Sequence, residues 1–421
     1  MSTAPVAAVY NRRLQLTAVT DRRYRSGPLV VRALLPFLAL LTACTAPAQT
    51  PPTPAPVAAP ARAEPVRAAP LPGDRPGQTP AGQQAGTVPR PAQLWPVTRI
   101  HGLDRVGARD IAKRYGLKTT WTKAGAVMAL SDAQGVRFTF ERDERDFRLD
   151  GARVFLGEPA VLNGDDLWLT KVDVIKTVAP LFAPSDHAAF LPAAPRVIVL
   201  DPGHGGTDPG KQNLRLKLDE KDMTLDVSLR LKKLLELRGY RVVMTRTTDT
   251  RFSNSPNVDL PLRADVANKA AADLFLSIHF NAVDRDPQRV SGVETYVLAP
   301  QGQASTQPEQ DRSMIATHYP GNRQDTANAL LGYTLHRQLV TGLKSSDRGY
   351  KRYRLAVLRT LNCPGALVEC AYLSNDAEAK RVATPEFRQQ IAEALAEGIS
   401  NYSATLAALR STPSPEPTMT R

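Results

Sequence analysis

The chain has 421 residues, a formal net charge of +13 and 42% hydrophobic residues, which is ordinary for a globular protein and long enough for two or more domains. Its 35 prolines are too many to spread evenly through folded cores, and its three cysteines exclude a disulfide framework. The positive charge suits an anionic polymer. We expect no nucleic-acid partner, because the sequence lacks zinc-finger cysteine pairs, a helix-turn-helix pattern and a basic stripe with aromatic residues.

Residues 1–44 have the features of an export signal. Six arginines and one acidic residue precede an apolar run at 33–41, which is too short to span a bilayer. The run leads into Leu41-Thr-Ala-Cys44, which resembles the lipobox of bacterial lipoproteins and implies that Cys44 is lipidated. Thr45 after the cysteine resembles the outer-membrane sorting pattern, so we expect an exported, periplasmic protein anchored by lipid in the outer membrane. The alternative is an uncleaved anchor or a chance cysteine.

Two segments are predicted to lie outside any core. Residues 45–92 contain 13 prolines in 48 positions, mixed with alanine and small polar residues, which is typical of an extended, semi-rigid linker. Residues 404–421 include the run Ser411-Thr-Pro-Ser-Pro-Glu-Pro417 and are predicted to form a disordered tail.

Residues 93–185 are predicted to form a small, strand-rich α+β accessory domain. Helices are expected at 106–116 and 172–181, and short alternating runs broken by Gly and Asp predict strands at 118–121, 126–130, 136–140, 147–149, 152–156 and 167–170. This order is similar to the small domain named after the N-terminal region of copper amine oxidases. The resemblance implies a packing or wall-binding module, and a plain structural spacer is the alternative.

From residue 196 onward strands alternate with helices, which predicts an α/β domain over 196–403 with its sheet flanked by helices on both faces. Strands are predicted at 196–200, 240–245, 274–279, 292–298 and 366–370, and helices at 220–238, 262–271, 326–343 and 385–402. The polar, glutamine-rich segment 299–325 is predicted to be a surface loop.

Four polar residues stand at the edges of these predicted elements. His204 follows a buried strand in a loop of glycines and prolines, which lets other groups approach its backbone closely. Glu220 begins a helix, His279 ends a strand, and Glu369 lies in an apolar strand, where a charge is costly unless it is paired or binds a metal. Two imidazoles and one carboxylate with an open fourth position are typical of catalytic zinc. Their spacings of 16 and 59 residues are weak evidence by themselves.

A series of motifs, in order and at ordinary spacing over about 196–403, resembles the zinc-dependent N-acetylmuramoyl-L-alanine amidases of the type 3 family. The motifs are Val199-Leu-Asp-Pro-Gly-His-Gly-Gly206, Glu220-Lys-Asp-Met-Thr-Leu225, Leu262-Arg-Ala264, Ser277-Ile-His-Phe-Asn-Ala282, Gly292-Val-Glu-Thr-Tyr296, Asp347-Arg-Gly349 and Leu367-Val-Glu-Cys-Ala-Tyr-Leu-Ser-Asn375. The sequence departs from the family at Ala371-Tyr372, where Gly-Phe is usual, and no catalytic group is lost there.

The resemblance implies one zinc ion held by His204, Glu220 and His279, with Glu369 as the catalytic base. It also implies the substrate, peptidoglycan. Zinc-activated water would hydrolyse the amide bond between N-acetylmuramic acid and the L-alanine of the stem peptide. The need for a regulatory activator protein stays open.

Several other residues have less specific interpretations. Asn281 and Arg246 are candidates for substrate binding, and structural hydrogen bonding explains them equally well. His318 and His336 carry no motif and are predicted to lie on the surface. Cys363 and Cys370 are predicted to be small buried residues, and Cys370 points away from Glu369 on an extended strand.

Two other functions stay open. A zinc peptidase with the same architecture would trim peptides and leave the sugar–peptide bond intact. A non-catalytic wall-binding or septal scaffold would act through the accessory domain, although the presence of all four site residues argues against it.

Overall fold

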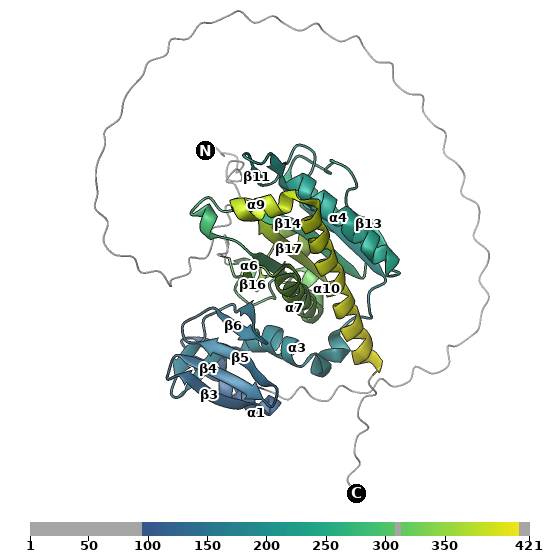
Figure 1. The fold of residues 1–421 in the computed structure, drawn as a ribbon. Coiled ribbons are helices and arrows are strands. Elements are labelled where there is room, and N and C mark those ends of the chain that lie inside the picture. Colours follow the sequence, from purple (N-terminus) through teal and green to yellow (C-terminus); the bar gives the residue numbers. More distant parts are fainter. Residues whose placement is uncertain (1–94, 308–312, 412–421) are drawn as a thin grey trace, which may run out of the picture. The chain divides into compact units, whose positions relative to one another are not determined.

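The computed structural model of the chain describes residues 95–307 and 313–411, which belong to one compact unit (Figure 1). The predicted signal with Cys44, the linker at 45–92 and residues 412–421 of the predicted tail lie outside the described residues. In the two described stretches, no helix is both long and apolar enough to cross a membrane.

The structure has the following strands: β1 (Thr98–Ile100), β2 (Leu103–Gly107), β3 (Lys118–Lys123), β4 (Val127–Asp132), β5 (Gly135–Glu141), β6 (Asp146–Leu149), β7 (Ala152–Phe155), β8 (Val161–Asn163), β9 (Asp166–Thr170), β10 (Val197–Pro202), β11 (Gln212–Asn213), β12 (Leu218–Asp219), β13 (Arg241–Met244), β14 (Leu274–Asn281), β15 (Val293–Val297), β16 (Asp347–Arg352) and β17 (Gly365–Tyr372). The α-helices are α1 (Ala108–Tyr115), α2 (Lys171–Asp173), α3 (Ala179–Phe182), α4 (Glu220–Leu237), α5 (Pro256–Lys269), α6 (Ser313–Ala316), α7 (Asp325–Leu343), α8 (Ala356–Arg359), α9 (Asp376–Ala383) and α10 (Pro385–Ser411). Shorter helical turns are η1 (Val174–Val178), η2 (Pro184–Phe190), η3 (Pro287–Arg289) and η4 (Pro320–Gln324).

One 11-stranded sheet runs through the unit in the order β13-β10-β14-β17-β15-β16-β7-β6-β5-β4-β3. Its first four strands are parallel, β15 is antiparallel to β17, and β16 is parallel to β15. Parallel strands end at the same edge of a sheet, so the carboxyl ends of β10, β14 and β17 lie together. His279 of β14 and Glu369 of β17 lie at this edge, and the loop after β10 carries His204.

Helices cover both faces of the sheet over residues 197–411, as predicted. Side chains of alternating residues on a strand point to opposite faces. On β14, Leu274, Leu276 and Ile278 therefore join the core under α4, α7 and α10, whereas Phe275 joins a second core with residues of α5 and α8. Figure 1 shows the long α10 lying across α7 and α4.

The N-terminal part has a helix or strand at each position predicted for the accessory region, and it adds β1, β2 and β8, which were not predicted. Its core is aromatic: Phe138, Phe140 and Phe147 pack within 5.3–6.1 Å of one another, and Phe182 of α3 packs 4.8 Å from Phe138. A second, four-stranded sheet has the order β1-β2-β9-β8. α1 ends where Gly116 adopts a left-handed conformation (φ 66°), which glycine adopts without strain.

The two parts share one sheet, which the sequence did not predict. β7 pairs in parallel with β16 at Val154 and Tyr350. The Arg352 guanidinium, 2% exposed, donates to the carbonyl of Phe155 across this junction. The accessory region and the α/β part are therefore joined by strand pairing and by a buried hydrogen bond, as well as by the chain segment between them.

The prediction of a surface loop at 299–325 is wrong for its first half. Gln303, Ser305, Thr306 and Gln307 are buried, and Gln303 donates to Asp173 of the accessory region. Gln303, Ser305 and Thr306 are hydrogen-bonded to residues 46 to 130 positions away in the sequence, and composition does not show such partners.

The predicted end of the last helix is also wrong. α10 continues to Ser411, so residues 404–411 are helical rather than part of a disordered tail. Tyr402 and Leu406 are buried in the main core, which explains why the helix continues past residue 403.

Candidate active site

The ends of three neighbouring strands bring the predicted site residues together. His279 on β14 is the register partner of Glu369 on β17, and β10 on the other side of β14 leads into the loop that carries His204. His279 and Glu369 have the same strand parity as Phe275 and Leu367, so they lie on the α5–α8 face of the sheet. Cys370 packs in the opposite core, as predicted.

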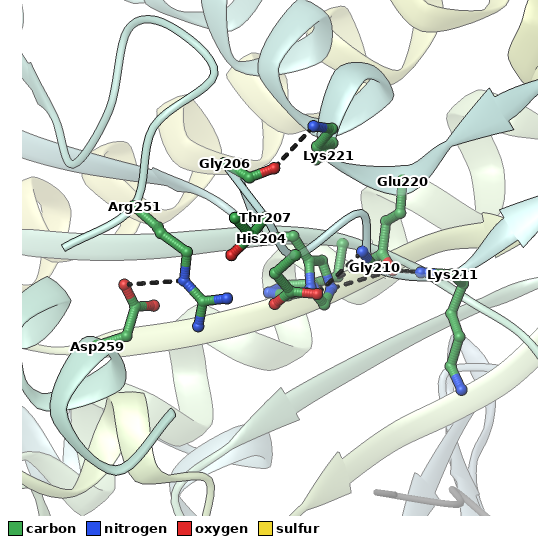
Figure 2. Close-up of polar contacts among 12 residues, drawn as sticks. His204, Gly206, Thr207, Gly210, Lys211, Glu220, Lys221, Arg251 and Asp259 are labelled. Atoms are coloured by element: carbon green, nitrogen blue, oxygen red, sulfur yellow. Dashed lines mark hydrogen bonds and ion pairs between the residues drawn. The ribbon is translucent and has the colours of Figure 1, made fainter. Parts of the chain in front are cut away.

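Glu220 stands between the two imidazoles at the start of α4. Its Oε2 lies 3.0 Å from His204 Nε2, and its Oε1 lies 2.9 Å from His279 Nδ1. The backbone amides of Lys211 and Phe280 each donate to one of these oxygens. Figure 2 shows Glu220 beside His204, Gly210 and Lys211. The carboxylate is 1% exposed, so its orientation is fixed by these contacts rather than by solvent.

His204 is held in a backbone conformation that is rare for a non-glycine residue, with φ of 62°. Its Nδ1 lies 3.0 Å from Asp208 Oδ2. Burial alone would lower the pKa of His204, but Glu220 and Asp208 together raise the pKa to about 10. Because an imidazole ligand must be deprotonated, metal binding at Nε2 would release this proton.

Two glycines of the His204 loop are required by close contacts at the site. A Cβ atom on Gly203 would lie 2.3 Å from the His279 ring, and a Cβ on Gly210 would lie 2.6 Å from Glu220 Oε2. Real Cβ atoms essentially never approach this closely, so any side chain here would displace a candidate ligand. This confirms the prediction that the loop allows close approach to its backbone.

Glu369 is 6% exposed and differs from Glu220 in its contacts. Its Oε2 is buried and accepts no hydrogen bond from any described residue. Burial raises the pKa of Glu369 well above its ordinary value, and the negative charges of Glu220 and Glu294 raise the pKa further. An unsatisfied buried oxygen costs roughly 1–3 kcal/mol, and such groups concentrate at functional sites.

His204, Glu220 and His279 form a donor set that fits a metal ion. One ligand atom from each residue lies within 4.8 Å of the others. Ligand atoms 2.0–2.1 Å from a tetrahedral zinc lie about 3.3 Å apart, close to the N···O contacts seen here. Two nitrogens and one oxygen are the set found in zinc hydrolases that keep a fourth position open. A cation at this position would also favour the ionised form of Glu369.

Two buried residues that the sequence did not single out individually support the His204 loop. Arg263 on α5 donates to the carbonyl oxygens of Pro202 (2.9 Å) and His204 (2.8 Å) and pairs with Asp201 (2.9 Å). Asp201, 1% exposed, also accepts hydrogen bonds from Thr245 and Ser277. Arg263 lies in the motif Leu262-Arg-Ala264, so the sequence marked this residue but did not indicate its role in holding the His204 loop.

Arg246 lies at the site but faces the backbone. Its guanidinium is bonded to the carbonyl oxygens of Pro202, Gly203, Lys221 and Thr248, and the residue is 5% exposed. Arg246 thus makes structural hydrogen bonds, the alternative interpretation of this residue, and it ties the His204 loop to the start of α4. Asn281, 4% exposed, donates to Glu294 and to the Tyr372 hydroxyl. Substrate binding by either residue stays a prediction.

A family model described as N-acetylmuramoyl-L-alanine amidase matches residues 198–401. The germination-specific N-acetylmuramoyl-L-alanine amidase of Bacillus subtilis is 30% identical over 221 residues, which cover 50% of this chain and 81% of that protein. The chain belongs to the N-acetylmuramoyl-L-alanine amidase family. It is therefore an enzyme of peptidoglycan hydrolysis, as predicted.

Other relatives of this amidase cover a similar part of the chain. AmiC of Escherichia coli is 32% identical over 238 residues, covering 51% of this chain and 54% of AmiC, so the amidase spans about half of that relative. Among solved structures, AmiC2 of Nostoc punctiforme is 30% identical with a TM-score of 0.40, covering 49% of this chain and 96% of that one.

Of the remaining histidine and cysteine predictions, those for His318, Cys363 and Cys370 agree with the structure and the one for His336 does not. His318 of the amidase is exposed, as predicted, but His336 is 0% exposed and lies 3.0 Å from Asp347 Oδ1, so the prediction of a surface residue is wrong. Helix α7 is buried on most of its surface, which places even a polar residue inside. Cys363 and Cys370 are buried, as predicted, and neither forms a disulfide among the described residues.

Proposed function

We propose that the amidase hydrolyses the bond between N-acetylmuramic acid and L-alanine with the help of one zinc ion held by His204, Glu220 and His279. The observation that supports it is the convergence of these three donors beside Glu369, whose buried oxygen has no partner among the described residues. Zinc in such a site polarises a carbonyl oxygen and makes water more acidic.

The chain's own residues supply the proton transfers in this proposal. Glu369 accepts a proton from the attacking water at its unpartnered oxygen and returns it to the amine that leaves with L-alanine. Glu220 and Asp208 orient His204, and Phe280 N–H and Lys211 N–H hold Glu220 in place. Because Glu369 has no ion-pair partner among the described residues, it is suited to proton transfer rather than to structural pairing.

Product analysis separates this function from its two alternatives. Purified protein with zinc is incubated with muropeptides, and the products are identified by mass spectrometry. We expect a free stem peptide beginning with L-alanine and an intact sugar. Cleavage inside the stem peptide would indicate the zinc peptidase, and the absence of any product would favour the non-catalytic scaffold.

We also propose that the amidase is exported and anchored by lipid on Cys44, in the periplasm and at the outer membrane. The apolar run before Cys44 and Thr45 after it support the proposal. Cys44→Ala is expected to abolish acylation, because the thiol that carries the lipid is absent. The measurement is incorporation of a labelled fatty acid in the producing bacterium, with Cys363→Ala as the matched control. Labelling of the Cys44→Ala protein would overturn the anchor.

A further inference from the structure

We infer that Arg348, oriented by the buried carboxylate of Glu294, binds a carboxylate of the substrate's stem peptide. This inference rests on the proposed function, because it assigns a subsite to the same active site. It follows from the register of four neighbouring strands, from the hydrogen bonds around Glu294 and from the unused donors of Arg348.

The four strands place a row of functional residues across one face of the sheet. His279 on β14 is the register partner of Glu369 on β17, and Glu369 is the partner of Glu294 on β15. Side chains of directly opposed residues point to the same face. The register between β15 and β16 shifts between Val293 and Thr295, beside Glu294, and Arg348 of β16 reaches Glu294 from the next strand.

Glu294 is 2% exposed and fully occupied by donors. Its Oε2 accepts from the Tyr296 hydroxyl at 2.6 Å, and its Oε1 lies 2.9 Å from Lys351 Nζ and 3.1 Å from Arg348 Nε. The Tyr372 hydroxyl donates to the same Oε1. A carboxylate with this many partners has no capacity left for substrate, so its role is to fix its neighbours.

Arg348 is the member of this cluster that reaches solvent. Its side chain is 25% exposed, against 3% for Glu294. Its Nε donates to Glu294 Oε1 and to the Tyr372 hydroxyl oxygen. Neither Nη nitrogen has a hydrogen-bond partner among residues 95–307 and 313–411. Lys351, 4% exposed, already pairs with Glu294, so the two cations exceed the one carboxylate between them. The planar pair of free N–H groups matches a carboxylate.

Tyr372 gives this amidase a support for Arg348 that a phenylalanine would lack. Its ring lies under the guanidinium at 5.3 Å, and its hydroxyl accepts from Arg348 Nε at 3.0 Å. Phenylalanine, the usual family residue at this position, would keep the ring contact and lose the hydrogen bond. The departure at this position therefore makes the orientation of Arg348 more rigid.

The distance from the reacting bond suits a group on the stem peptide. Two strand spacings separate β17, which carries Glu369, from β16, or about 10 Å between backbones. An extended peptide covers this in about three residues. The first amide of the stem peptide is cut at Glu369 in the proposed function, so a carboxylate on the following residues reaches Arg348.

The test compares two synthetic muramoyl peptides, one with free carboxylates on the stem peptide and one with each carboxylate converted to a primary amide. We expect the zinc-loaded, full-length amidase to prefer the free acid in kcat/KM by about 10- to 100-fold, as for a hydrogen bond to a charged group. Arg348→Gln should remove this preference mainly through a higher KM for the acid. Tyr372→Phe should reduce it by a smaller factor, and Arg285→Gln, which changes an 87% exposed arginine, should leave it unchanged.

The outcomes are distinguishable. Equal kcat/KM of the unaltered amidase for both peptides overturns the subsite and leaves the proposed function intact. Arg348→Gln that keeps the preference, with zinc content equal to the unaltered protein, also overturns it. If Arg348→Gln lowers kcat/KM equally for both peptides, Arg348 has a structural role and the carboxylate subsite is overturned. If Arg348→Gln does not fold, the comparison of the two peptides and Tyr372→Phe still decide. The absence of turnover on either peptide contradicts the proposed function itself.

Discussion

Glu369→Gln is expected to lower kcat by about 10²–10⁴-fold while the protein keeps one zinc ion. Glutamine has the same size and reach as glutamate but cannot accept a proton at the position of the Glu369 oxygen, which has no partner among residues 95–307 and 313–411. The three candidate ligands do not include Glu369, so metal content should not change. The measurements are turnover of a purified muropeptide and zinc content by elemental analysis.

A matched control for this change is Glu393→Gln, which alters an exposed glutamate on α10 and should leave both quantities unchanged. Loss of zinc from Glu369→Gln would make the glutamate a ligand. Full activity with zinc retained would place the base on another residue.

His204→Ala is expected to lose zinc and activity together, with turnover reduced by at least about 10³-fold. Removing one of three protein ligands should weaken metal binding far more than removing a supporting residue, for which losses of about 10–100-fold are typical. Asp208→Asn provides that comparison, because Asp208 contacts His204 Nδ1 and lies outside the ligand triad.

The two variants should therefore form a graded series in zinc affinity, measured by titration with a competing chelator. Stoichiometric zinc in purified His204→Ala would contradict the ligand set. A loss in Asp208→Asn as large as in His204→Ala would place Asp208 among the ligands.

The sequence was a better guide to the candidate site residues than to the buried residues that hold them in place. His204, Glu220, His279 and Glu369 stand in motifs at predicted strand ends and a helix start, and parallel strands bring such ends together. Asp201 and Arg263 were harder to assign, because their roles depend on partners 60 or so residues away that only the folded chain identifies. Family likeness located the chemistry, and tertiary contacts were needed to explain its rigidity.

The clearest failure concerned β16, the run Asp347-Arg-Gly-Tyr-Lys-Arg352, which the sequence did not predict as a strand. Four charged residues in six are typical of an exposed segment. Lys351 and Arg352 are nevertheless buried: Lys351 pairs with Glu294, and the Arg352 guanidinium donates to the carbonyl of Phe155. The buried Gln303 and His336 were missed for the same reason, since a polar residue is placed inside by a partner that composition does not reveal.

The pairing of β7 with β16 limits how freely this enzyme can be divided or recombined. A bare edge strand presents unpaired backbone groups to other chains, and β7 covers that edge in the amidase. A shortened gene product starting near residue 196 would expose β16 and leave the buried Arg352 guanidinium without the Phe155 carbonyl, 197 positions earlier in the sequence. Substitutions in the accessory region that move β7 would therefore also move β16, the strand that carries Arg348. The two halves are expected to evolve together rather than as exchangeable modules.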